Sequence, residues 1–195
     1  DIAACIPALN YRTDEELRNA IKEIKEKTNS TALGINLIVN KSNIKLKKQL
    51  QSCLDLEVDF IITSLGSPKE IIQKCKAKGI KVFCDVINLE MAKKVQDLNA
   101  DGIIAVNSSA GGHLGKLSAT EIINHFKDEI NIPVISAGGI GTKAGIAEKI
   151  DMGFSGVSIG SPFIACEEAD ISKEYKNACV YYGKEDIVIS TKISG

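Results

Sequence analysis

Two glycine-containing segments in the second half of the chain have the composition of a phosphate-binding site. Residues 137–142 read Ala-Gly-Gly-Ile-Gly-Thr, and residues 159–162 read Ile-Gly-Ser-Pro. Successive glycines let backbone N–H groups approach an anion, and the start of a following helix adds a favourable dipole. The second segment offers another N–H group and a hydroxyl. Two such loops at adjacent strand ends can hold one phosphate between them, and the alternative is two tight turns without a ligand.

A histidine follows another pair of glycines. Gly111 and Gly112 precede His113 in a segment that comes directly after an apolar run. Imidazole exchanges protons readily near neutral pH, and a loop at a strand end can present it to a ligand whose phosphate lies two loops away. A lone histidine is more often a surface or hydrogen-bonded core residue. That reading holds for His125, which lies beside Phe126 on a predicted helix.

The composition excludes several other kinds of function. The chain has 195 residues with 24 basic and 25 acidic groups and no tryptophan, which argues against a nucleic-acid partner. It has no apolar run long enough to span a membrane. The six cysteines include no C-x-x-C pair and lie mostly in apolar segments. We therefore expect reduced, buried thiols in a cytoplasmic protein, and no metal site.

Six short runs supply the strands that must position these loops. They are almost continuously apolar, as is typical of parallel strands covered on both faces or closed in a barrel. Their starts lie 21 to 31 residues apart, which leaves room for one helix and two loops. The predicted strands are residues 34–39, 59–64, 81–86, 102–108, 133–138 and 156–160.

Helices are predicted between the strands by their start signals. Capping boxes are expected at Thr13, Ser67 and Ser118, with Pro68 in the first helical position, and Thr142 opens a further helix. The apolar spacing from Leu89 to Leu98 indicates another, and a last helix is expected over residues 169–182. No linker-like segment interrupts the pattern, so we expect a single domain over residues 1–195.

Repeated βα units fit either an open doubly wound sheet or a TIM-type (β/α)8 barrel. No G-x-G-x-x-G follows an early strand, as a dinucleotide-binding open sheet would require. The glycines instead concentrate after the fourth, fifth and sixth predicted strands, and barrels commonly build a phosphate site from their last two βα loops. The sequence therefore predicts a barrel.

The segments that carry these features resemble a known family. GINLIVN, AGGHLG, PVISAGGI and GVSIGSPFIACEE are similar to motifs of the flavin-dependent nitronate monooxygenases, a group that includes the flavin-type enoyl-acyl-carrier-protein reductases. The resemblance extends from the PALNYRT segment to ISTKISG and so covers nearly the whole chain. The order and spacing of the motifs are specific, although each motif alone is not.

The resemblance implies an FMN-dependent oxidoreductase that acts on a small molecule. It implies that His113 is the active-site base, which assists proton removal from the carbon beside a nitro group while the flavin takes the electrons. The residues implied to bind the cofactor are Asn36, Gly112 and, through backbone amides at the phosphate, Gly138, Gly139, Gly160 and Ser161.

Two other functions stay open. One is an enoyl-acyl-carrier-protein reductase, in which His113 would orient or protonate the acyl substrate. That branch tends to carry an acidic residue before the histidine loop, where this chain has residues 106–108, Val-Asn-Ser. The other is a truncated, non-catalytic flavin- or phosphate-binding domain. Asp85 and Lys116 are expected to be rim charges, with pocket lining as the alternative.

The length predicts an incomplete barrel. A complete one has eight strands and uses about 250 residues. Six strands in 195 residues are two too few, apart from an extra short strand expected at 187–191. The family that the chain resembles has two βα units before the segment where this chain begins. The resemblance therefore implies that the first two units are missing and that residues 1–12 are the loop leading out of the second. We expect weakened or lost FMN affinity in such a fragment. A homo-oligomer also stays open.

Overall fold

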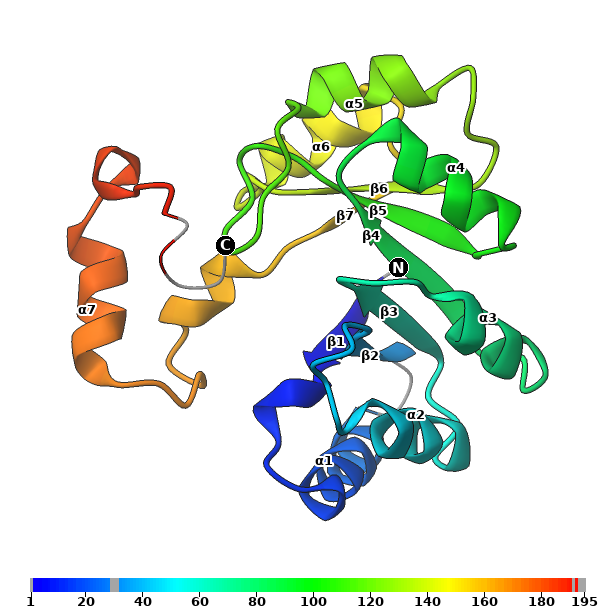
Figure 1. Ribbon diagram of the computed structural model, residues 1–195. Helices are drawn as coiled ribbons and strands as arrows, with labels where there is room; N and C mark the ends of the chain where they lie inside the picture. Colours follow the sequence, from blue (N-terminus) through cyan, green and yellow to red (C-terminus); the bar gives the residue numbers. More distant parts are fainter. Residues whose placement is uncertain (1, 29–31, 191, 193–195) are drawn as a thin grey trace.

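Seven strands form one parallel sheet in the computed structural model of the chain, which describes residues 2–28, 32–190 and 192. Each strand pairs with its neighbour in the sequence, from β1 to β7. Figure 1 shows that the sheet curves and carries helices on its outer side, as in an incomplete TIM-type (β/α)8 barrel. The predicted fold class is confirmed. The strands are β1 Ala3–Pro7, β2 Ala32–Ile38, β3 Phe60–Ser64, β4 Lys81–Val86, β5 Gly102–Val106, β6 Val134–Ala137 and β7 Gly156–Ser158.

Helices α1 to α6 lie on the convex side of this sheet, whereas α7 stands apart from it (Figure 1). The predicted last helix is shorter than expected, because Ser172 caps it and it begins only at Lys173. No helix of the described ranges is long and apolar enough to cross a membrane. The helices are α1 Asp14–Lys27, α2 Leu46–Asp55, α3 Lys69–Lys76, α4 Leu89–Asp97, α5 Ala119–Phe126, α6 Lys143–Asp151 and α7 Lys173–Tyr181, with short 3-10 turns η1 Ala8–Asn10, η2 Ser161–Ala165 and η3 Lys184–Asp186.

Two predictions about the chain ends are wrong. Residues 3–7, which were expected to belong to a loop, form β1, and Cys5 pairs with Gly34 of β2. The count of six strands is therefore one too low. This segment becomes a strand through pairing with β2 rather than through a β-branched run, because Ile6 is its one β-branched residue. Residues 187–190 form no strand, and residue 191 lies outside the described residues.

The helix starts follow the predicted caps with one exception. Thr13 and Ser118 form complete capping boxes, and the Thr142 hydroxyl accepts a hydrogen bond from the N–H of Gly145. Ser67 does not cap α3. Pro68 occupies the cap position itself, so Ser67 lies one residue outside the helix, where its hydroxyl cannot serve the first turn.

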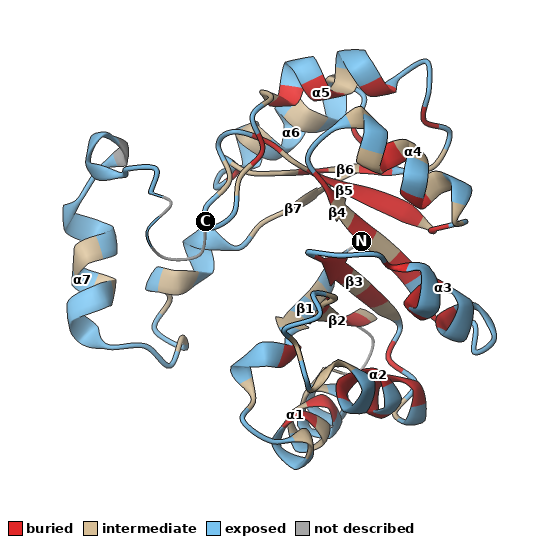
Figure 2. Ribbon diagram, in the orientation of Figure 1, coloured by how far each residue is buried: buried red, intermediate tan, exposed pale blue. Residues whose placement is uncertain are grey.

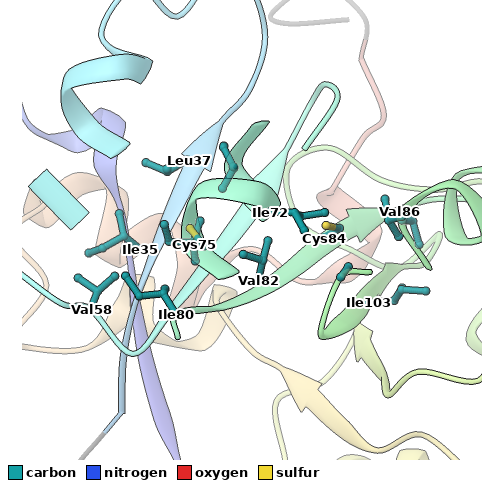
Figure 3. Packing of buried hydrophobic residues seen from close by; sticks show 14 of the residues in the cluster. Ile35, Leu37, Val58, Ile72, Cys75, Ile80, Val82, Cys84, Val86 and Ile103 are labelled. Atoms are coloured by element: carbon teal, nitrogen blue, oxygen red, sulfur yellow. The ribbon is translucent and has the colours of Figure 1, made fainter. Parts of the chain in front are cut away.

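The two faces of the sheet differ in burial (Figure 2). On the convex face Leu33, Ile35 and Leu37 of β2 are at most 1% exposed. Figure 3 shows this core continuing to Val82 of β4 and Cys75 of α3. The concave face is partly open, and Asn36 and other residues on it are only half-buried. Three cysteines, Cys53, Cys75 and Cys84, are buried as expected, but Cys5 and Cys179 are exposed.

Four helices end with the same local structure. After α2, α3, α4 and α6 one residue takes a positive φ, and the next residue donates its N–H to a carbonyl in the last turn. The residue with the positive φ is Glu57, Gly79, Asn99 or Gly153, and the donor that follows is Val58, Ile80, Ala100 or Phe154. All four donors are buried, so each motif anchors the start of the next strand in the core.

Glu57 is the one member of this set that is strained by its side chain, since φ is 48° and glutamate has no local way to favour that region. We predict that Glu57→Gly raises the free energy of unfolding by about 0.5–1 kcal/mol, because the relief of left-handed strain exceeds the added entropy of the unfolded chain. Lys25 binds the backbone carbonyl of Glu57 at 2.6 Å, and this bond survives the substitution.

Urea unfolding measures the effect. Gly79→Glu is the matched control, because Gly79 ends α3 with φ of 72° and a Cβ there would meet nothing within 4 Å. It should lower the stability by a similar amount. A loss of stability in Glu57→Gly would contradict the assignment of strain to Glu57.

Candidate functional site

The buried side chain of Asn107 ties together two loops at the carboxyl ends of neighbouring strands. It is 2% exposed and follows β5 directly. Its Nδ2 donates to the carbonyl of Gly138 at 3.1 Å, and its Oδ1 accepts from the N–H of Ser109 at 2.7 Å. Its own N–H donates to the carbonyl of Ala137 at 3.0 Å. One amide therefore fixes the loop that carries His113 against the glycine turn after β6.

Close packing explains why the turn after β6 needs two glycines. Gly138 has φ of 118°, and a Cβ there would lie 2.4 Å from Oδ1 of Asn107. Gly139 has φ of 70°, and a Cβ would lie 2.9 Å from Cβ of Ser109. From the sequence, these glycines are expected either to give an anion access to the backbone or to form a tight turn. The structure shows that they first of all make room for the neighbouring loop.

A third loop joins the other two after β7. A Cβ on Gly111 would lie 2.7 Å from Oγ of Ser161, so the histidine loop and the start of η2 touch. Gly160, just before η2, is different, because a Cβ there would meet nothing within 4 Å. The side of this junction that Gly160 faces is open. The structure thus brings four predicted residues, Gly138, Gly139, Gly160 and Ser161, into one cluster of loops.

These loops carry backbone donors that have no partner among the described residues. Among the hydrogen bonds of the described residues, none uses the N–H of Gly138, Gly139 or Gly160 as its donor. The cluster also precedes α6, whose nine residues begin at Lys143. Available N–H groups, an open position at Gly160 and the start of a helix are the donor set that a phosphate requires. The residues present therefore fit a phosphate-bearing cofactor.

His113 lies in the loop after β5 and has no hydrogen-bond partner among the described residues. It is exposed, and Gly112 before it has φ of 80° with open space where a Cβ would be. Within the described residues no side chain or backbone group hydrogen-bonds the imidazole. The structure places His113 at the carboxyl end of β5. Lys116, further along the loop, is exposed, as expected of a rim charge.

A polar layer lines the concave face below the loops. Nδ2 of Asn36 donates to Oγ of Ser64 at 3.0 Å, and the Ser64 hydroxyl donates to a carboxylate oxygen of Asp85 in a short hydrogen bond. These residues come from β2, β3 and β4. Asp85 is therefore not the rim charge that the sequence favoured but a half-buried interior residue. Burial raises the pKa of its carboxyl to about 6, against the opposing effect of the Ser64 hydrogen bond.

The sequence analysis did not identify Ser64. Its signal is the two-residue period of β3, which places Phe60, Ile62 and Ser64 on one face. Cys5 of β1 lies on the same concave face. It keeps solvent-accessible surface at the edge of the sheet, yet the burial of its thiol, and then the charge of Asp85, raise its pKa to about 12.

Two phenylalanines fill the concave face nearer the amino ends of the strands. The rings of Phe60 and Phe83 meet edge to face with centroids 5.8 Å apart. A Cβ on Gly34 would lie 2.1 Å from the Phe60 ring, and one on Gly102 would lie 2.8 Å from Phe83, so each ring lies over a glycine. This aromatic layer closes the lower part of the curve. A ligand is left with the polar layer and the loops above it.

Comparison with known proteins identifies the family. The model of the nitronate monooxygenase family matches residues 8–195. The chain belongs to this family. It is 30% identical over 169 residues to a probable nitronate monooxygenase of Staphylococcus saprophyticus, covering 78% of this chain and 48% of the relative.

A second relative of this chain is a dehydrogenase of Rhodococcus jostii, which is named for a bicyclic carboxyl-CoA substrate. It is 29% identical over 183 residues, which cover 94% of this chain and 51% of the relative. The chain thus spans about half the length of both curated relatives. Among solved structures, FabK from Thermotoga maritima superposes with a TM-score of 0.82 at 30% identity, over 90% of this chain and 55% of FabK.

The raised pKa of Asp85 predicts a pH-dependent stability. The folded protein holds this proton more tightly than the unfolded chain, whose aspartate has an ordinary pKa of 3.8. The free energy of unfolding therefore falls as the pH rises from about 4 to about 6, by about 1–2 kcal/mol for a half-buried group. Between pH 4 and pH 7, the free energy of unfolding of Asp85→Asn should therefore rise by that amount relative to the wild type.

Urea unfolding of both proteins across this range measures the difference. A constant difference between wild type and Asp85→Asn would mean that Asp85 titrates as an exposed aspartate does.

Proposed function

We propose that the chain binds FMN and acts in an oxidoreductase that oxidises nitronates or similar small carbon acids. The observation that carries this proposal is the set of N–H groups at Gly138, Gly139 and Gly160 that have no partner within the described ranges, in a chain that belongs to the nitronate monooxygenase family. These groups lie at the carboxyl ends of β6 and β7. A phosphate site at this position is a recurrent use of the barrel fold.

The chain divides the binding of FMN between two regions. The N–H groups of the three glycines, with the hydroxyl of Ser161, hold the phosphate. Gly112, which has open space where a Cβ would be, and Asn36 of the polar layer would hold the ring system. The Phe60 and Phe83 layer prevents deeper entry, which keeps the ligand at the carboxyl ends of the strands.

His113 acts as the base. Its exposed imidazole takes the proton from the carbon beside the nitro group, and the substrate becomes a nitronate anion. Bound FMN supplies the redox chemistry by accepting the substrate's electrons. The loop fixed by Asn107 keeps His113 close to the phosphate loops, and ligand binding supplies the orientation that no protein side chain provides.

A charge placed at Gly160 tests the phosphate site. We predict that Gly160→Asp weakens FMN binding at least tenfold, because its carboxylate repels the phosphate at close range. Gly160→Asn is the matched neutral control and should cost less. The open space at Gly160 lets either side chain fit without disturbing the fold. Fluorescence quenching of FMN by the flavin-free chain measures the affinity.

Riboflavin, which lacks the phosphate, completes the test. Its affinity should be the same for the wild type, Gly160→Asp and Gly160→Asn. Equal losses for FMN and riboflavin would place the phosphate elsewhere, and an unchanged FMN affinity in Gly160→Asp would contradict the site.

The role of His113 is tested with two forms of one substrate. We predict that His113→Gln lowers kcat/KM for a neutral nitroalkane at least 100-fold, which is typical of losing a general base. The preformed nitronate needs no proton removal, so its kcat/KM should fall much less. His125→Gln, on α5, is the control. Equal losses for both substrate forms, or no loss at all, would contradict the assignment of the base.

A second candidate function is the reduction of an enoyl thioester. It is supported by the Rhodococcus jostii relative, which is named for a carboxyl-CoA substrate and aligns over 94% of this chain. Oxidation of NADH or NADPH that depends on an enoyl thioester, without nitronate oxidation, would select this function. FMN binding without turnover of either substrate would select a non-catalytic binding domain.

A further inference from the structure

Asn36, Ser64 and Asp85 form a chain of hydrogen bonds. Which group donates and which accepts depends on whether Asp85 carries a proton. An ionised carboxylate only accepts hydrogen bonds, so Ser64 must give its hydroxyl proton to Asp85. Oγ of Ser64 then has only lone pairs to offer Asn36. The amide of Asn36 must therefore turn its Nδ2 toward Ser64, at 3.0 Å. Its Oδ1 is left as an acceptor for a ligand.

Protonation of Asp85 removes this constraint. A neutral carboxyl group can donate to Oγ of Ser64, and the serine hydroxyl is then free to turn toward Asn36. Oδ1 of Asn36 lies 3.4 Å from that hydroxyl, so the serine can donate to it. In that arrangement the serine takes one lone pair of the oxygen that a ligand would use, which weakens it as an acceptor, or the amide rotates to present a donor instead.

The groups next to Asp85 are neutral, so the proton on Asp85 itself controls the direction of these hydrogen bonds. From β1 the titratable neighbour is Cys5, whose thiol has a raised pKa and stays neutral. From β3 the neighbour is the neutral Ser64, and on β5 the residue paired with Asp85 is Ile104. Cys84 on β4 itself is buried and has its pKa raised to about 11. Lys81, at the far end of β4, pairs with Asp101 at 3.1 Å.

We propose that Asp85 is a positioning residue that acts through Ser64 to fix the amide of Asn36, so that Oδ1 of Asn36 accepts a hydrogen bond from a ring N–H of the bound flavin. This inference rests on the proposed function, because the contact between Asn36 and the flavin ring is part of that proposal. It adds that the ionised form of Asp85 favours recognition of the ring. Ring binding is therefore weakened on acidification.

Riboflavin is the probe that isolates this effect, because it has no phosphate that titrates in the same range. Its dissociation constant is measured by fluorescence quenching with the 195-residue chain between pH 5 and pH 8. The wild type should bind riboflavin about three- to tenfold more weakly at the acid end, the ratio that one hydrogen bond provides. The change should be centred at about pH 6, where Asp85 titrates.

Three variants separate positioning from structure. Asp85→Asn and Ser64→Ala should bind riboflavin weakly at every pH, with no transition near pH 6. Ser64→Thr keeps the hydroxyl and should restore both the affinity and the transition. Circular dichroism at each pH establishes that the variants are folded.

Each outcome decides between the claims. A transition that persists unchanged in Asp85→Asn or Ser64→Ala overturns the role of Asp85 and leaves the proposed function intact. If the wild type binds neither FMN nor riboflavin at any pH, the proposed function is overturned and this inference with it.

Discussion

The amide of Asn107 is the interaction on which the rest of the site depends. It is almost fully buried, so both of its ends must find partners, and it finds them in two different loops. Meeting this requirement brings the turn after β6 so close that no side chain fits at Gly138 or Gly139. The same contact sets the path of the loop that carries His113. The glycines of the turn after β6 and the position of the histidine loop both follow from one buried polar side chain.

The concave face carries different kinds of side chain at its two ends. Near the amino ends of the strands, aromatic rings lie on glycines, which fills space without polar groups. Near the carboxyl ends the chain keeps Asn36, Ser64 and Asp85, although burial makes the charge of Asp85 costly. A fold selected only for stability would not place a carboxylate there. The polar layer is therefore the part of the concave face that offers hydrogen-bonding groups.

Much of this architecture could be predicted from the sequence. The apolar runs of β2 to β7 and the capping boxes at Thr13 and Ser118 are strong local signals, and the glycine loops at residues 137–142 and 159–162 follow directly after strands. β1 could not be found in this way, because its residues gain their extended form from pairing with β2. The left-handed turn at Glu57 is likewise invisible, since position rather than residue type imposes it. The sequence favours a rim charge at Asp85, because a single strand does not reveal which face of the sheet will be enclosed.

The central claim is that backbone amides at the ends of β6 and β7 bind the phosphate of FMN. Nuclear magnetic resonance tests it most directly, because glycine amides resonate in a distinct region of the nitrogen-15 spectrum. On titration of the labelled, flavin-free chain with FMN, the N–H resonances of Gly138, Gly139 and Gly160 should move to the low field typical of amides bound to phosphate. With riboflavin the same three resonances should stay close to their free positions. Equal movement with both ligands, or no movement with FMN, would contradict the account.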